Sequence, residues 1–222
     1  MQVFVDSSNP VEIQEACSWG LIDGVTTNPS LIAAAGPDKE RTLTRILEVS
    51  PGPVLVQAIG WHDPKPLVAQ ACFLHGLSDR IIVKLPMSQA GIQALYQLKQ
   101  NRPGIKLAVT AVASISQAYL CGKMGADIVA LFNGPFDLSS DTPVELVAPV
   151  RKVYDNYGFK TQILSCGRFP RHFAEFAENG SDICTLKLEF MKLLYVHPYT
   201  DQRMTGFLND WQRVFGEAIW TE

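Results

Sequence analysis

The sequence predicts an α/β fold, a single (β/α)8 TIM barrel followed by an extra C-terminal helix. Apolar runs alternate with helical patterns eight times along the 222 residues, about 28 residues for each repeat. The runs are continuous rather than alternating, which is typical of a parallel sheet covered on both faces. No shift in composition marks a second domain. We therefore expect residues 1–222 to form one barrel domain, with 201–222 as a C-terminal interface helix and tail.

The third observation is a lysine inside one of these runs, Arg-Ile-Ile-Val-Lys-Leu-Pro at 80–86. Lysine is almost never fully buried without a reason, and Pro86 is expected to stop the strand just after Lys84. Lys84 would then lie at the C-terminal edge of a barrel strand, where this fold carries out its chemistry. The side chain could simply extend its ammonium group into solvent. Alternatively, burial would leave part of it as a neutral amine that forms Schiff bases with carbonyls.

Each repeat is supported by an apolar run and by the residues that punctuate it. The strands, rich in Val, Ile and Leu, are expected at 2–5, 24–26, 54–57, 80–86, 105–109, 127–131, 161–164 and 183–186. Helices are indicated by apolar residues at helical spacing, by Ser, Asn or Pro at their starts and by Gly at their ends. They are expected at 10–19, 31–35, 38–49, 64–74, 89–100, 114–122, 143–157, 170–178 and 188–196. A Gly/Pro/Ser/Asp-rich loop is expected at 133–141.

The segment beyond the last repeat, 201–222, carries an apolar stripe at helical spacing. Its members are Phe207, Leu208, Trp211, Val214 and Phe215. The stripe could pack on its own barrel. Alternatively, it could reach a neighbouring subunit, since an exposed apolar stripe usually marks an interface.

The composition excludes several classes of function. A net charge of -3 and a pI near 5.8 argue against nucleic-acid binding. No apolar stretch reaches the ~18 residues of a membrane span, and no secretion signal is expected, because the N-terminus reads directly as a strand. Five cysteines without a C-x-x-C pair suit the reduced thiols of a cytoplasmic protein, and the four scattered histidines indicate no metal site.

Polar side chains follow several predicted strands, and a closed barrel would bring them to one rim. The residues at the strand ends are Asp6, Thr26 to Asn28, Gln57, Lys84, Thr110, Phe132, Ser165 to Arg168, and Leu186–Lys187. Alone, Asp6 could cap a helix, Asn28 could hold a turn, and Thr110 could pack in the barrel. Beside a buried lysine they favour an aldol-type Schiff-base site. There Asp6 would orient the substrate or take a proton, and Thr110 would position a water molecule.

Two arginines, Arg168 and Arg171, follow the seventh predicted strand beside Gly167. The loops after strands seven and eight of this fold commonly hold a phosphate group. Guanidinium groups and the free N–H groups at a helix start suit that charge. Alternatively, the two arginines lie on a solvated helix face.

Three segments resemble the signature segments of the transaldolase family. They read Val-Asp-Ser-Ser at 5–8, Gly-Val-Thr-Thr-Asn-Pro-Ser at 24–30 and Ile-Val-Lys-Leu-Pro at 82–86. The resemblance covers essentially the whole chain. It is strongest to the small bacterial and phage-type branch, which contains fructose-6-phosphate aldolase and the short transaldolases. The tail at 207–216 resembles the swapped C-terminal helix through which that branch forms pentamers and decamers.

The resemblance implies a class I aldol mechanism on sugar phosphates, in the pentose phosphate pathway of carbohydrate metabolism. Lys84 matches the Schiff-base lysine and Asp6 the acid/base carboxylate. Asn28 matches the residue that holds substrate hydroxyls, and Thr110 matches the threonine that positions the water. No metal or organic cofactor is implied, because the imine is the electron sink.

Further substrate-binding residues are expected beside this set. They are Thr27, Phe132, Cys166, Arg168 and Arg171. The two arginines match basic residues that hold the acceptor's phosphate. Cys166 stands where the family usually has a serine.

Two positions separate the branches of the family. Gln57 resembles the aldolase, because transaldolases carry a water-activating glutamate there. Phe132 resembles the transaldolases, because the aldolase carries a tyrosine there. The family's usual arginine is also absent from the segment 133–137. We therefore expect transaldolase-type transfer of a dihydroxyacetone unit. Fructose-6-phosphate aldolase is the first alternative, and a catalytically weak sugar-phosphate-binding barrel is the second.

Overall fold

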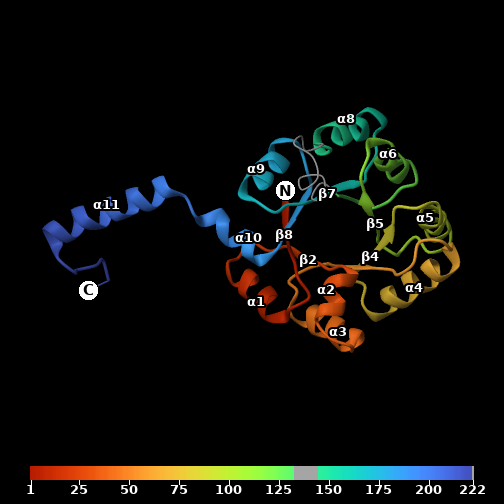
Figure 1. Cartoon of the computed structure of the whole chain (residues 1–222), viewed down its shortest axis with the longest axis horizontal. Coiled ribbons are helices and arrows are strands. Elements are labelled where there is room, and N and C mark those ends of the chain that lie inside the picture. Colours follow the sequence, from red (N-terminus) through yellow and green to blue (C-terminus); the bar gives the residue numbers. More distant parts are fainter. Residues whose placement is uncertain (133–144, 222) are drawn as a thin grey trace.

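The computed structural model describes residues 1–132 and 145–221, and its centre is a closed barrel of eight parallel strands (Figure 1). The strands are β1 Gln2–Asp6, β2 Gly24–Thr26, β3 Val54–Gln57, β4 Ile81–Pro86, β5 Leu107–Val112, β6 Ile128–Leu131, β7 Gln162–Cys166 and β8 Ile183–Leu186. Each strand pairs with the next along the chain, and β1 pairs with β8 to close the barrel. The predicted fold class is confirmed.

Helices surround the barrel and alternate with its strands (Figure 1). They are α1 Pro10–Ser18, α2 Pro29–Ala34, α3 Lys39–Val49, α4 Pro64–Leu77, α5 Gln89–Asn101, α6 Ile115–Lys123, α8 Val147–Tyr157, α9 Pro170–Glu178, α10 Leu188–Lys192, the 3-10 turn η1 Leu193–Tyr195, and α11 Pro198–Phe215. Several helices begin where the sequence places a capping side chain. Asn9, Asn28, Ser88 and Ser114 each accept an N–H from the first turn.

The core has two layers, because successive strand residues point to opposite sides of the sheet. A small cluster fills the barrel and includes Phe4, Leu55, Leu164 and Ile183. A larger cluster lies between the strands and the surrounding helices. Both faces of the sheet are therefore buried, which explains why the strands read as continuous apolar runs.

In two strands, pairing continues further along the chain than the sequence predicts. β4 continues through Pro86, so Lys84 lies inside the strand rather than at its junction with a loop. Proline is tolerated there because the N–H that joins this end of β4 to β5 belongs to Met87, which donates to the Thr110 carbonyl at 2.9 Å. β5 begins at Leu107 instead of 105 and runs to Val112, with a register shift between Val109 and Val112.

Three helix boundaries also differ from the expected ones. α4 passes through Gly76 to Leu77, because one glycine costs a helix only about 1 kcal/mol. The expected helix 143–157 begins at Val147, and the Glu145 carboxylate accepts the Val147 N–H at 2.7 Å. Residues 143–144 and the expected loop 133–141 lie outside the described residues. The expected helix 188–196 is a short α-helix that ends in the 3-10 turn η1.

Helix α11 extends away from the barrel (Figure 1). It starts at Pro198, earlier than expected, and none of its residues is buried. Phe207, Leu208, Val214 and Phe215 are all exposed. The stripe therefore does not pack on its own barrel. Among the described residues, no helix combines the length and apolarity needed to cross a bilayer.

Candidate active site

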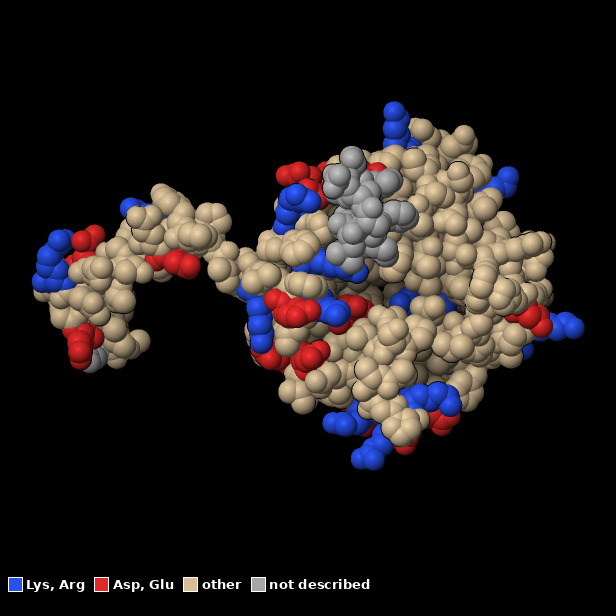
Figure 2. Space-filling model, in the orientation of Figure 1, with Lys and Arg blue, Asp and Glu red and all other residues tan. Residues whose placement is uncertain are grey.

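A cavity of about 760 Å³ opens at the C-terminal ends of the strands. Figure 2 shows it as a hollow near the centre of the barrel face, with Lys and Arg atoms inside and at its rim. Leu55, Ala130 and Leu164, which belong to the cluster inside the barrel, form its floor. The floor is thus apolar, and the charged groups stand just above it.

The cavity walls are formed by inward-facing residues. On each strand, these residues come directly after the ones that fill the barrel core. The strands alternate, so every second residue along each strand points inward. The inward residues that line the cavity are Asp6, Thr26 and Asn28, Gln57, Lys84, Thr110, Phe132, Cys166 and Arg168, and Thr185 and Lys187. The structure thus brings together eight of the ten predicted site residues.

Lys84 stands on β4 with only 7% of its surface exposed. Its Nζ donates to the backbone carbonyl of Thr27 at 2.5 Å. Burial lowers the pKa of Lys84, and the neighbouring Cys166 and Asp6 oppose that effect. The amine is consequently easier to deprotonate than an ordinary lysine, as a nucleophile requires.

Asp6 ends β1 and shares the cavity with Lys84. Its Oδ1 accepts a hydrogen bond from Thr26 Oγ1 at 2.8 Å, and the hydroxyls of Thr26 and Thr185 lie 2.6 Å apart. Because Thr26 gives its proton to Asp6, Thr185 is the donor in the second contact. Burial raises the pKa of Asp6, while Thr26, Lys84 and Lys187 oppose the rise. A raised pKa makes a carboxyl group easier to protonate, which suits a group that takes up and returns protons.

Thr110 lies where β5 is irregular. The register shift between Val109 and Val112 surrounds it, and the next residue, Ala111, has φ of 62°. A positive φ at a non-glycine residue is strained, and such strain and such bulges concentrate at functional sites. Both Thr110 and Ala111 line the cavity, so the bulge shapes the wall next to Lys84.

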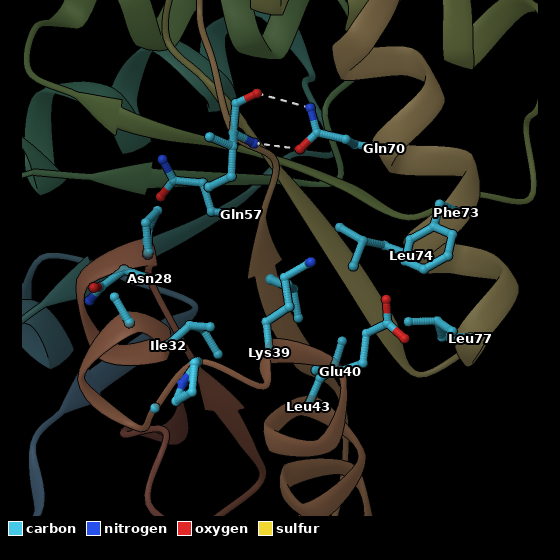
Figure 3. Close-up of a pocket in the computed structure, with 16 residues that line it drawn as sticks. Asn28, Ile32, Lys39, Glu40, Leu43, Gln57, Gln70, Phe73, Leu74 and Leu77 are labelled. Atoms are coloured by element: carbon cyan, nitrogen blue, oxygen red, sulfur yellow. Dashed lines mark hydrogen bonds between the residues drawn. The ribbon is translucent and has the colours of Figure 1, made fainter.

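Gln57 and Asn28 border a second hollow as well as the cavity. This apolar groove of about 660 Å³ lies between α2–α3 and α4 (Figure 3). Its walls are Ile32, Leu43, Phe73, Leu74 and Leu77. In α4, Gln70 exchanges two hydrogen bonds with the backbone of Ile59 and so holds the chain just after β3. Asn28 also accepts the Leu31 N–H and starts α2.

The wall formed by β6 and β7 combines an aromatic, a thiol and a guanidinium group. Phe132, Cys166 and Arg168 all line the cavity. Burial raises the pKa of the Cys166 thiol to about 12, so it is neutral at physiological pH. A neutral thiol is a weaker hydrogen-bond donor than the serine hydroxyl expected at this position.

Two predicted site residues do not present their side chains to the cavity. Thr27 follows the inward-facing Thr26 and points outward, where its hydroxyl donates to the Leu55 carbonyl at 2.8 Å. Arg171 lies on α9 with its side chain 69% exposed, and it pairs with Glu175 at 3.1 Å. Thr27 instead contributes its backbone carbonyl, which holds Lys84.

The site also contains residues that were named only as strand ends or not at all. Thr26, Thr185 and Lys187 line the cavity, and Phe190 closes its edge. The alternation of side-chain direction along a strand could have identified them. In β8, Ile183 points into the barrel, so Thr185 and Lys187, two and four residues later, point inward as well. Within residues 1–132 and 145–221, no three His, Cys, Asp or Glu side chains are grouped so that they could hold a metal ion.

Residues 3–219 match the family model described as transaldolase/fructose-6-phosphate aldolase. The chain belongs to this family. It is 40% identical over 215 residues to a probable transaldolase of Dictyoglomus turgidum, covering 96% of this chain and 99% of that one. A probable transaldolase of Hydrogenobaculum sp. is 38% identical over 96% of this chain and 98% of its own. The predicted family is confirmed.

The fold is also found in more distant proteins. Thiamine phosphate pyrophosphorylase from Pyrococcus furiosus superposes with a TM-score of 0.55 at 17% identity, covering 83% of this chain and 85% of that one. This likeness concerns the barrel alone, because unrelated activities share the fold.

Proposed function

We propose that this transaldolase-family enzyme transfers a dihydroxyacetone unit between sugar phosphates through a Schiff base on Lys84. One observation carries the proposal: a buried lysine whose pKa is lowered by burial opens into the same cavity as a half-buried carboxyl whose pKa is raised. The first shift favours the neutral amine that a nucleophile requires, and the second makes the carboxyl easier to protonate.

In the proposed reaction, Lys84 Nζ attacks the C2 carbonyl of a ketose phosphate such as fructose 6-phosphate or sedoheptulose 7-phosphate. The adduct loses water and becomes a protonated imine. Asp6 takes the proton of the C4 hydroxyl, the C3–C4 bond breaks, and its electron pair moves into the imine. An aldose phosphate leaves, and the three-carbon unit remains on Lys84 as an enamine. No metal or organic cofactor is needed, because the imine accepts the electron pair.

The enamine then attacks the aldehyde of a second aldose phosphate, and Asp6 returns its proton to the new hydroxyl. Asn28 is the proposed holder of substrate hydroxyls, with the backbone of Thr27 as support for Lys84. Thr110 is the proposed holder of the water that enters when the imine is hydrolysed. This step releases the product and restores the amine.

Transfer is preferred over release of free dihydroxyacetone because of one cavity residue, Phe132. Its ring has no hydroxyl group and cannot help to activate a water molecule. Hydrolysis of the enamine after its protonation would then be slow, which gives an acceptor aldehyde time to react. Fructose-6-phosphate aldolase is the second candidate, favoured by Gln57.

Paired assays distinguish these activities. Purified protein is given fructose 6-phosphate with and without erythrose 4-phosphate, beside Lys84→Met. Glyceraldehyde 3-phosphate that forms only with the acceptor is the expected result. Its formation without the acceptor, together with free dihydroxyacetone, would identify the aldolase, and Phe132→Tyr should move the protein in that direction. If no product forms and borohydride does not label Lys84, the transaldolase and the aldolase activity are both contradicted. The remaining function would then be that of a sugar-phosphate-binding barrel.

We also propose that the chain works as a homo-oligomer, a pentamer or decamer, in the cytoplasm, with 1–200 as the barrel and the tail as its interface. The support is α11, an 18-residue helix in which no residue is buried and whose apolar residues Phe207, Leu208, Val214 and Phe215 are exposed. Such stripes are stable in water when another surface covers them.

A further inference from the structure

Lys187 is a second cation on the wall that also carries Arg168. The two residues follow adjacent strands, β8 and β7, and both face inward in phase with the barrel core. Sequence reasoning paired Arg168 with Arg171 instead. Arg171 is 69% exposed and is engaged by Glu175 at 3.1 Å, outside the cavity.

The charges in the cavity favour an anion. Besides the Lys84 amine, which the proposed reaction uses in its neutral form, the described lining residues include two cations, Arg168 and Lys187, and one carboxylate, Asp6. The whole chain carries a net charge of -3, so this positive balance is local. A cationic cleft with low-dielectric walls concentrates anionic ligands.

Lys187 is held loosely enough to bind such a ligand. Its Nζ lies 3.9 Å from Glu189 Oε1, and the two side chains are 53% and 66% exposed. Ion pairs of this kind contribute little to stability, so a phosphate can displace the contact. The ammonium group nevertheless acts inside the cavity: burial raises the pKa of Asp6, and the charge of Lys187 is among the influences that oppose the rise.

Lys187 also lies across the cavity from Lys84. In a closed barrel of eight strands in chain order, β4 and β8 lie on opposite walls. A ketose joined to Lys84 through C2 extends its far end across the cavity, toward β7 and β8. The loops after these two strands commonly hold phosphate in this fold.

We propose that Lys187 is a specificity-determining residue which, with Arg168, holds the substrate's phosphate and sets the preference for phosphorylated over unphosphorylated sugars. This inference rests on the proposed function for its substrate class. It replaces Arg171 with Lys187 as the partner of Arg168, and it assigns a task to a residue that the Schiff-base chemistry itself does not use.

Calorimetric binding of glucitol 6-phosphate and of glucitol tests the assignment without any reaction, since neither compound has a carbonyl group. The wild-type protein should bind the phosphate ester measurably more tightly than glucitol. Lys187→Met should weaken glucitol 6-phosphate binding about tenfold, as expected for a partly exposed charge-assisted contact, and Lys187→Arg should restore most of it. Lys192→Met is the matched control, because Lys192 is 52% exposed but pairs with Glu15 outside the cavity.

Two results would overturn the assignment: equal binding of glucitol 6-phosphate by Lys187→Met and wild type, or a loss just as large in Lys192→Met. Kinetics give a second readout. Lys187→Met should raise KM for fructose 6-phosphate by a larger factor than KM for unphosphorylated fructose, because only the first substrate carries the phosphate. An equal increase in KM for both substrates would also overturn the assignment. Failure of the Schiff-base proposal looks different: wild-type Lys84 would then resist labelling, whatever the calorimetry shows.

Discussion

At the barrel mouth, two ionisable groups stand above an apolar floor: Lys84 is buried and Asp6 is half-buried. In α11, by contrast, Phe207, Leu208 and Phe215 are apolar groups exposed to solvent. Both placements are unfavourable in themselves, because ionisable groups are more stable in water and apolar groups are more stable out of it. At the mouth the cost of desolvation appears as shifted pKa values, which a reaction can use. In α11 the cost is exposed apolar area, which another surface can remove. The first misfit points to chemistry and the second to assembly.

The largest effect is expected from removing the amine. Lys84→Met keeps a long side chain but has no nucleophile, so turnover should fall by on the order of 10⁴-fold or more. Borohydride labelling in the presence of fructose 6-phosphate, followed by mass spectrometry, should find no adduct. The control is Lys106→Met, because Lys106 is an exposed lysine just before β5, at the end of the barrel away from the cavity. Wild-type-like activity in Lys84→Met would remove the basis for treating the buried lysine as chemical.

Asp6→Asn tests whether the buried carboxyl transfers protons. The amide keeps the size of the side chain and can still contact Thr26, but it cannot accept a proton. Turnover should fall by about 10²–10⁴-fold, while borohydride labelling of Lys84 persists. Thr185→Val is a useful companion, because it removes the end of the hydrogen-bond chain that leads to Asp6. Full turnover in Asp6→Asn would show that another group moves the proton.

Truncation tests the other half of the comparison. A chain that ends at Thr200 should sediment as a smaller species than the full-length protein. It should still fold, because no α11 residue is buried against the barrel. Phe207→Lys should act in the same direction, and Gln212→Lys, on the same helix but outside the stripe, should not. An unchanged mass for the truncated chain would show that α11 is not the interface.

The smallest effect is a shift along the pH axis. Because burial lowers the pKa of Lys84, its labelling by dihydroxyacetone and cyanoborohydride should level off at a pH below 10.5, the ordinary lysine value. The folded pKa lies below the unfolded one, so the charged amine costs stability below the folded pKa, and the cost disappears as pH rises toward the unfolded value. In urea unfolding, the free energy of unfolding of the wild type should therefore increase relative to that of Lys84→Met as the pH rises. Labelling that follows an ordinary lysine would contradict the desolvated amine.

Much of the fold and the site could be predicted because both depend on short-range patterns. Continuous apolar runs predict strands covered on both faces, and residues such as Asn28 and Ser88 mark helix starts by hydrogen bonds within one turn. The observed strand boundaries differ from the predicted ones where pairing with a strand distant in the sequence sets them. β5, for example, extends to Val112 around a bulge that β6 stabilises and that no local pattern announces.

The sequence by itself determined the barrel, the family and the lysine at its centre, because apolar periodicity and a few adjacent residues carry that information. Only the tertiary structure decided which neighbours face the cavity. Thr26 and Thr27 are adjacent and equally polar, yet one contacts Asp6 and the other points outward. Arg171 and Lys187 are both cations near a strand end, yet only Lys187 continues the inward phase of its strand. The physical reason is that the direction of a side chain depends on the register of the closed sheet, which all eight strands set together.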